Sequence, residues 1–204
     1  MLDAEPPNVD GARETAKRTI RDGRRAADVI SRLRALFTHK EAATELVDLN
    51  EATEEVIALS RTELEQNGVI TRTEFAAELP FVTGDRTQLQ QVILNLLRNG
   101  SDAMSAVDER PRELRFTTEV EQGNCVRLSV RDAGVGFEPQ ALDRLYQSFY
   151  TTKSDGMGIG LSVSRSIIES HHGRLWATPN DGPGVTFSFS IPHADRLTNH
   201  SGEN

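Results

Sequence analysis

The chain has 204 residues, of which 37% are hydrophobic and 26% charged, with a formal net charge of −8 at pH 7. This composition is typical of a globular domain with a further segment attached, and the acidic balance argues against general nucleic-acid binding. The single cysteine, Cys125, excludes an internal disulfide and favours a reducing compartment. The sequence contains neither a membrane-spanning apolar stretch nor a signal peptide at its start. We therefore expect a cytoplasmic chain without membrane contact of its own.

The first predicted element is one long helix at residues 11–38, which contain no proline and a single interior glycine. Apolar side chains recur at helical spacing in two adjacent rows and form a wide stripe: Ile20, Ala26, Ala27, Val29, Ile30, Leu33, Leu36 and Phe37. Such a helix packs into a bundle, so we expect a homodimer through residues 11–38. The basic residues of this helix indicate either a solvated face or a docking surface for an acidic partner.

The rest of the chain is expected to form a linker at residues 41–45, a compact domain at residues 46–192 and a disordered polar tail at residues 193–204. Residues 46–50 predict a short strand that ends at a helix cap, Asn50. Alternating strands are predicted at residues 69–75, 112–121, 125–132, 174–178 and 185–192, and helices at residues 51–66, 139–146 and 161–171. This order predicts an α+β sandwich with helices on one face of a mixed sheet.

A further helix opens at a cap, Asp85 or Thr87, and continues through QQVILNLLRNGSDAM, residues 90–104. Its apolar residues recur at helical spacing, yet Asn95, Asn99 and Asp102 fall on one face. This polar line is either the wet side of an amphipathic helix or a magnesium-phosphate site. Asparagine carbonyls are hard oxygen ligands, which suit Mg²⁺ shared with substrate phosphates.

Two glycine-rich segments follow. RDAGVGF, residues 131–137, places Asp132 at a strand end before Gly134 and Gly136. It is either a simple turn or a purine site, because a carboxylate accepts from an exocyclic amine and glycines allow close approach. TTKSDGMGIGLSVSR, residues 151–165, carries Lys153 just before its alternating glycines and runs into a predicted helix start. It is either a flexible linker or a phosphate loop whose N–H groups and helix N-terminus favour anions, and it matches no Walker loop or dinucleotide fingerprint.

The order of five motifs is specific: the asparagine helix, Asp-x-Gly-x-Gly, Phe-Tyr-Thr-Thr-Lys, Gly-x-Gly-x-Gly-Leu, and Gly-Pro-Gly-Val-Thr-Phe. On these residues the chain resembles the catalytic ATP-binding half of a two-component sensor histidine kinase. The resemblance covers about residues 20–192 and is nearest the PAS-linked, oxygen-sensor-like branch that regulates nitrogen fixation. It implies an ATP-binding α/β sandwich of the histidine kinase and gyrase type. Residues 1–40 would then be the second helix of the dimerisation and phosphotransfer bundle.

The resemblance also implies roles for individual residues. Asn99 would ligate Mg²⁺, Asp132 would bind adenine, and Thr186 would lie beside the adenine. Residues 149–155 would form a mobile lid. The implied ATP-binding positions are Asn95, Asn99, Asp102, Asp132, Gly134, Gly136, Phe149, Thr152, Lys153, Gly156, Gly158, Gly160, Leu161 and Thr186. The implied activity is transfer of the γ-phosphate of ATP to a histidine for relay to a response regulator receiver domain. The implied partners are therefore ATP or ADP, that receiver domain and the bundle helix of a partner kinase chain.

Three departures from the family pattern stand out. Gly100 occupies a place that usually holds alanine, and Val185 a place often held by threonine. The chain contains no His-Glu acceptor motif, and none of its five histidines, His39, His171, His172, His193 and His200, has that context. We therefore assign no catalytic residue in this chain, and we expect that the chain alone does not autophosphorylate.

Two alternatives stay open beside the kinase hypothesis. One is a non-catalytic interaction or dimerisation fragment, and the other is a stand-alone ATPase or serine kinase on the same fold. ATPases of this kind carry a glutamate, as base for water, four residues before the magnesium asparagine. That position is Asn95 here, and an amide accepts no proton at neutral pH. The sequence therefore argues against the ATPase.

Overall fold

The computed structural model describes residues 8–16, 18, 19, 23, 44–121, 124–136 and 160–194. The chain divides into two units, Met1–His39 and Lys40–Asn204, a division that falls beside the predicted boundary at residue 40. In the first unit, residues 9–16, 18, 19 and 23 are helical. The remainder of the predicted long helix, the predicted helix at residues 139–146 and the tail from residue 195 lie outside the described residues.

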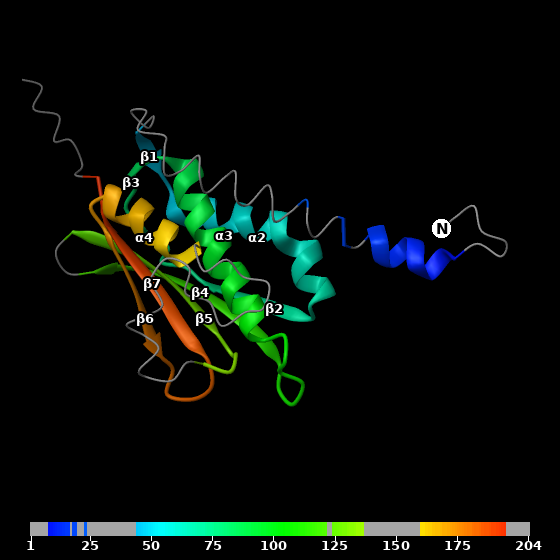
Figure 1. Ribbon diagram of the computed structural model, residues 1–204. Helices are drawn as coiled ribbons and strands as arrows, with labels where there is room; N and C mark the ends of the chain where they lie inside the picture. The colour runs from blue at the N-terminus through cyan, green and yellow to red at the C-terminus, as the bar shows by residue number, and fades with distance from the viewer. Residues whose placement is uncertain are drawn as a thin grey trace, which may run out of the picture. The chain divides into compact units, whose positions relative to one another are not determined.

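The second unit is built on a five-stranded sheet in the order β2-β4-β5-β7-β6. Its strands are β2 Val69–Glu74, β4 Arg112–Glu121, β5 Cys125–Asp132, β7 Val185–Pro192 and β6 Arg174–Pro179. Strand β2 is parallel to β4, whereas the other neighbours are antiparallel. Strands β1 Glu45–Val47 and β3 Val82–Gly84 form a separate antiparallel pair. Figure 1 shows the helices α2 Leu49–Gln66, α3 Arg86–Ala103 and α4 Gly160–Ser170 against one face of the sheet. The predicted α+β fold with a mixed sheet is confirmed.

The core lies between this sheet and the helices. Along β5 and β7 every second side chain points inward, and the cross-strand partners Leu128 and Phe189 are both fully buried. Helix α3 covers them with an apolar face made of Leu89, Val92, Ile93, Leu96 and Leu97, all at most 1% exposed. The alternate residues point to the opposite, polar face, where the Ser129 and Ser188 hydroxyls are 2.8 Å apart and hydrogen bonded. The alternation therefore decides which side of the sheet each residue of the site can reach.

The N-terminal caps of two helices differ in part from the prediction. Helix α2 is capped by Asp48, whose carboxylate accepts from the Asn50 N–H at 2.8 Å and the Glu51 N–H at 3.2 Å. Asn50 is therefore inside the helix rather than its cap, and strand β1 ends at Val47. The prediction was wrong here because two cap-forming residues, Asp48 and Asn50, lie within three positions of each other. Helix α3 is capped by Asp85, one of the two predicted candidates.

The hydrogen-bonded part of the domain extends slightly beyond the predicted limits at both ends. Strand β1 begins at Glu45, and His193 forms an antiparallel bridge with Val82. The Ala194 N–H then donates to the Phe81 carbonyl at 2.8 Å. His193 and Ala194, predicted to begin the tail, are thus hydrogen bonded to the domain. In the part of the chain that the structure describes, no helix is long and apolar enough to cross a bilayer.

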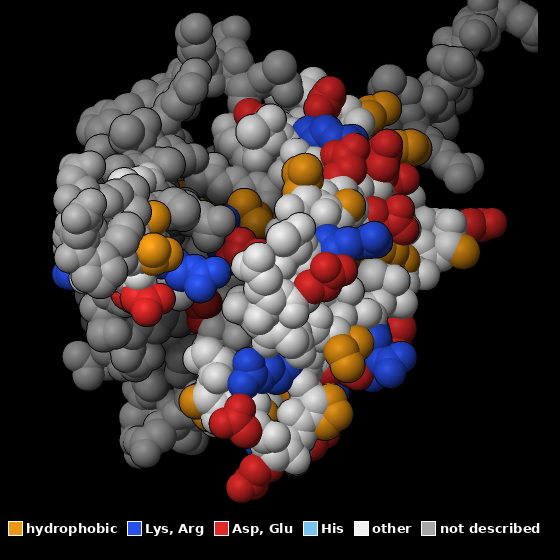
Figure 2. Space-filling view, turned by 90° about the vertical axis from the view of Figure 1, so that its right-hand side faces the viewer, with side chains coloured by type: hydrophobic (Ala, Val, Ile, Leu, Met, Phe, Trp, Pro, Cys, Tyr) orange, Lys and Arg blue, Asp and Glu red, His pale blue; other side chains and the backbone are white. Residues whose placement is uncertain are grey.

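Charged side chains populate the surface of this unit in pairs of opposite sign. On the polar face of the sheet, Arg115 lies 2.6 Å from Glu74 and 2.9 Å from Glu113. Figure 2 shows acidic, basic and apolar side chains interspersed on the face it presents. Such exposed pairs contribute little to stability individually.

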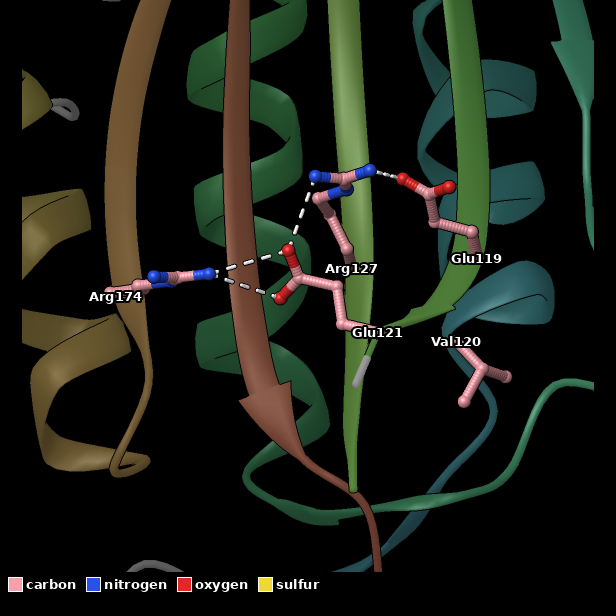
Figure 3. Close-up of a pocket in the computed structure, with 5 residues that line it drawn as sticks. All are labelled: Glu119, Val120, Glu121, Arg127 and Arg174. Atoms are coloured by element: carbon pink, nitrogen blue, oxygen red, sulfur yellow. Dashed lines mark hydrogen bonds and ion pairs between the residues drawn. The ribbon is translucent and has the colours of Figure 1, made fainter. Parts of the chain in front are cut away.

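A pocket of about 360 Å³ lies on the polar face and is lined by Glu119, Val120, Glu121, Arg127 and Arg174. Figure 3 shows Arg127 between the two glutamates, and Arg174 reaches Glu121 from β6 at 3.3 Å. Two guanidinium groups thus balance two carboxylates. The strand alternation places this pocket on the face opposite the helices, so it is separate from the site described below.

Gly100 explains one departure from the family pattern. It is buried in α3, and a Cβ there would lie 2.5 Å from Leu114 Cδ2 and 3.3 Å from Asp132 Cβ. The missing side chain lets α3 approach the sheet closely at the end of β5. Glycine inside a helix costs about 1 kcal/mol relative to alanine, so the close approach outweighs helix propensity at this position.

We expect Gly100→Ala to lower the free energy of unfolding by about 1–3 kcal/mol, because overpacking exceeds the gain in helix propensity. Urea unfolding measures this change. The control is Thr87→Ala, a substitution at an exposed position of the same helix, which should leave stability within about 0.5 kcal/mol of the parent. A Gly100→Ala chain more stable than the parent would contradict the packing argument.

Candidate functional site

The site is centred on Asp132, the last residue of β5, which is only 4% exposed. Its Oδ1 accepts from the Gly134 N–H at 2.8 Å and from the Val185 N–H at 3.3 Å. Burial raises the pKa of this carboxyl, and the two backbone N–H groups offset part of that rise. Because both donors reach Oδ1, the other oxygen, Oδ2, is the one that can accept from a ligand.

The turn after Asp132 requires its glycines. A Cβ on Gly134 would lie 2.7 Å from Asp132 Oδ1 and 2.8 Å from the Ala103 carbonyl. Gly136 has a φ of 76°, a conformation that favours glycine. The Val135 N–H donates to the Ala103 carbonyl at 3.3 Å and attaches the turn to the end of α3. The predicted glycine-rich turn is therefore a close contact between backbone segments.

Arg110 holds the same turn from outside. Its Nε donates to the Ala133 carbonyl at 3.0 Å and its Nη2 to the Gly134 carbonyl at 2.9 Å. Sequence reasoning missed Arg110 because a single arginine in a polar loop belongs to no motif.

The polar line on α3 is partly a contact between helices. The Asn95 Nδ2 donates to the Ser164 hydroxyl of α4 at 2.9 Å, and a Cβ on Gly160 would lie 2.4 Å from Asn95 Oδ1. Asn95 thus holds the first turn of α4 against α3. Asn99 lies one turn further along α3 and is partly buried, whereas Asp102 is exposed. The interpretation as a wet helix face therefore fits Asp102 but not Asn95.

Helix α4 begins at Gly160 with Leu161 next, both partly buried. The first N–H groups of a helix have no partner within it, and together with the helix dipole they favour an anion. The predicted lid and phosphate-loop residues Phe149, Thr152, Lys153, Gly156 and Gly158 lie outside the described residues. Their roles stay predictions.

Thr186 is not brought to the Asp132 carboxylate. Thr186 pairs with Arg131 across β5 and β7, so its side chain lies on the polar face of the sheet. Its hydroxyl donates to Asn180 Oδ1 at 2.7 Å. The contact with the carboxylate comes instead from the main chain of Val185. The inward row of Val185, Phe187 and Phe189 is a period-two signal that could have revealed this arrangement from the sequence.

These elements meet along α3. Asp132 lies against Gly100, since a Cβ on this glycine would lie 3.3 Å from Asp132 Cβ. The start of α4 touches Asn95, and Asn99 lies between the two contacts along the helix. Asn95 and Asn99 are four residues apart, which corresponds to about 6 Å along the helix axis. A buried carboxylate, an amide oxygen and a helix N-terminus thus follow one another, and groups of these kinds suit a base amine, a cation and anions respectively.

Comparison with known proteins assigns the class. Residues 84–195, more than half of the chain, match the family described as Histidine kinase-, DNA gyrase B-, and HSP90-like ATPase. The chain belongs to this family. The match includes all described residues of the candidate site, from Asn95 to Thr186.

Two curated relatives are a sensor protein and a sensor histidine kinase. The chain is 37% identical over 195 residues to sensor protein FixL of Bradyrhizobium diazoefficiens, covering 96% of this chain and 38% of FixL. It is 33% identical over 189 residues to sensor histidine kinase TmoS of Ectopseudomonas mendocina, covering 92% of this chain and 19% of TmoS. The chain therefore spans less than two fifths of the length of these relatives. The resemblance to a sensor histidine kinase is confirmed.

Solved structures agree. The catalytic domain of histidine kinase ThkA is 32% identical, with a TM-score of 0.65, over 74% of this chain and 95% of that one. Full-length ShkA in complex with AMPPNP is 26% identical, with a TM-score of 0.70, over 82% of this chain and 35% of that one. These matches support the histidine kinase catalytic fold for the second unit.

Proposed function

We propose that this chain is the ATP-binding catalytic part of a sensor histidine kinase in the cytoplasm. It would transfer the γ-phosphate of ATP to a histidine outside the five of this chain. The observation that carries the proposal is the buried Asp132 carboxylate, which has one oxygen held by two backbone N–H groups. The relatives named above are a sensor protein and a sensor histidine kinase, and a structural neighbour, ShkA, was solved with AMPPNP.

In this proposal the bound nucleotide lies along α3. Asp132 Oδ2 accepts from the exocyclic amine of adenine, and the N-terminus of α4 lies toward the phosphates. The Asn99 side-chain oxygen would hold Mg²⁺, which supplies neutralisation of phosphate charge. Lys153, Gly156 and Gly158 are proposed to complete the phosphate side.

The transfer itself is mostly positioning and electrostatic stabilisation. An imidazole nitrogen attacks the γ-phosphorus, the bond to the β–γ bridging oxygen breaks, and ADP leaves. His171 is unsuited as the acceptor within this chain, because its Nδ1 donates to the Ile167 carbonyl at 2.7 Å and its Nε2 accepts from the Asp85 N–H at 3.0 Å. Both ring nitrogens are therefore engaged, which supports an acceptor elsewhere.

We further propose that the phosphate passes to a response regulator receiver domain. Histidine kinase ThkA has been solved in complex with response regulator protein TrrA. It is 25% identical to this chain, with a TM-score of 0.67, over 84% of this chain and 49% of that one. Pairing of residues 11–38 with the bundle helix of a second kinase chain, as a homodimer, belongs to the same proposal.

Hydrolysis of ATP by water is disfavoured in this site. The Asn95 amide accepts no proton, and its Nδ2 is committed to Ser164 at 2.9 Å. We therefore propose transfer of the phosphate rather than its hydrolysis.

Calorimetry and phosphoryl transfer test the proposal together. The chain is expected to bind ATP with a Kd between about 1 µM and 1 mM, more tightly with Mg²⁺. It should also label a separately supplied bundle that carries the His-Glu motif. Asn99→Ala should remove the gain in affinity from Mg²⁺ and slow transfer by at least about tenfold, because a hard oxygen ligand is lost.

Asn67→Ala is the matched control, since Asn67 lies beyond α2 and donates to the Ser101 hydroxyl at 3.2 Å. It should keep the Mg²⁺ dependence and the transfer rate. The proposal fails if the chain does not bind ATP in either condition. The magnesium assignment fails if Asn99→Ala responds to Mg²⁺ like the parent.

A further inference from the structure

Asn180, in the turn between β6 and β7, uses every hydrogen-bonding group of its side chain. Its Nδ2 donates to the Asp132 carbonyl at 2.9 Å and to the Pro183 carbonyl at 3.0 Å. Its Oδ1 accepts from the Thr186 hydroxyl at 2.7 Å. Its backbone N–H also donates to the Gly184 carbonyl at 3.2 Å. One side chain thus joins the end of β5, the turn and the start of β7.

These bonds hold the turn directly against the main chain of the site. Gly184 has a φ of 93°, and a Cβ on it would lie 2.0 Å from the Asp132 carbonyl oxygen. The next residue is Val185, whose N–H donates to Asp132 Oδ1 at 3.3 Å. The donor that orients the carboxylate is therefore placed by the turn that Asn180 anchors.

Thr186 acts on this arrangement through Asn180. An asparagine amide can rotate by 180° and exchange its oxygen and nitrogen. The Thr186 hydroxyl has a proton for Oδ1, and the two carbonyls of Asp132 and Pro183 need the N–H groups of Nδ2. Because carbonyls only accept, they fix the orientation in which Nδ2 faces Asp132, and the Thr186 hydroxyl stabilises that orientation by donating to Oδ1.

We propose that Asn180 is a positioning residue for base recognition, with Thr186 as its support. It holds the turn so that the Val185 N–H occupies Oδ1 of Asp132 and leaves Oδ2 directed at the amine of a 6-aminopurine. This inference rests on the proposed nucleotide site and names what selects the base. A 6-oxopurine presents a carbonyl oxygen to the same carboxylate, so selection depends on how firmly the carboxylate is oriented.

The experiment compares the Kd values of ATP and inosine triphosphate, its 6-oxo analogue, by calorimetry. The parent chain should prefer ATP by at least about tenfold, because an exocyclic donor is exchanged for an acceptor. Asn180→Ala should reduce this preference to within about threefold, mainly by weakening ATP, while inosine triphosphate binds nearly as before. Thr186→Val keeps the shape of the side chain and should reduce the preference by about threefold.

Asn50→Ala is the matched control. Asn50 has a similar bonding pattern, with its Nδ2 donating to one main-chain carbonyl, that of Ala76, at 2.9 Å and its Oδ1 accepting from the Thr118 hydroxyl at 2.8 Å. It lies in α2 rather than in the candidate site. Urea unfolding should show a loss of stability for both alanine variants, but only Asn180→Ala should lose the preference for ATP.

Three results would overturn the inference. The first is an unchanged preference in Asn180→Ala, and the second is an equal loss of preference in Asn50→Ala, which would indicate general loosening. If Asn180→Ala does not fold, an unchanged preference in Thr186→Val decides against the inference. Each of these leaves nucleotide binding by the parent intact. A parent chain that binds neither nucleotide would instead overturn the proposed function, and this inference with it.

Discussion

Asp132→Asn is expected to weaken ATP binding by at least about tenfold while it raises the free energy of unfolding at neutral pH. The amide oxygen can still accept from the Gly134 and Val185 N–H groups that now reach Oδ1. The amide nitrogen then faces the ligand in place of Oδ2. A purine amine would meet another donor there, and hydrogen bonds to charged groups contribute about 1.5–3 kcal/mol.

The gain in stability follows from the pKa of Asp132, which burial raises in the folded chain. A raised folded-state pKa means that the contribution of Asp132 to stability is fully present below its unfolded pKa. That contribution is lost as the pH rises through the folded pKa. Asparagine does not ionise, so the advantage of Asp132→Asn should grow from about pH 4 upward and level off above the folded pKa.

Urea unfolding across this pH range, with calorimetry at pH 7, measures both effects. The control is Asp181→Asn, the same change at an exposed residue of the β6–β7 turn, which should alter neither quantity appreciably. An Asp132→Asn chain that binds ATP like the parent would show that the carboxylate does not recognise the base. A pH-independent difference in stability would contradict the burial argument.

Local patterns in the sequence predicted much of the fold because periodicity reports burial directly. The alternation in residues 112–121 and 125–132 predicted the antiparallel hairpin of β4 and β5. The apolar spacing of residues 90–104 predicted α3 and its polar line. Asp132 was found because a carboxylate at a strand end before two glycines is a local feature.

The rest of the site depends on contacts between distant segments, which no local pattern reports. Arg110 and Gly134 are 24 residues apart in sequence, and Asn180 and Asp132 are 48 apart. The place of Thr186 beside the adenine stays a prediction from the motif match, which takes no account of strand alternation. The alternation puts Val185 on the buried face and Thr186 on the polar face.

Substitution of glycines by alanine separates two reasons for which this fold needs glycine: a positive φ and the lack of space for a Cβ. Gly184 combines a φ of 93° with a Cβ position 2.0 Å from the Asp132 carbonyl oxygen. Gly68, after α2, has a φ of 64° but no atom within 4 Å of the Cβ position. Gly182 has open space around its Cβ position and no positive φ. The three positions therefore form a graded series within one chain.

Gly184→Ala is expected to cause the largest loss, more than about 3 kcal/mol of unfolding free energy. Alanine is strained at a positive φ, and its Cβ would also force the neighbouring main chain of Asp132 to move. Gly68→Ala should lose about 1–2 kcal/mol from its left-handed conformation alone. Gly182→Ala should change stability by less than about 1 kcal/mol, and a small gain is expected because alanine has fewer unfolded conformations.

Nucleotide binding distinguishes the site from the scaffold in the same series. Gly184→Ala displaces the Asp132 main chain or the Val185 N–H, so the folded fraction should lose most of its affinity for ATP, measured by calorimetry at low temperature. Gly68 follows α2 and lies outside the candidate site, so Gly68→Ala should bind ATP like the parent. If Gly184→Ala kept the parent's affinity, the close contact between the turn and Asp132 would contribute to stability alone, and base recognition would not depend on it.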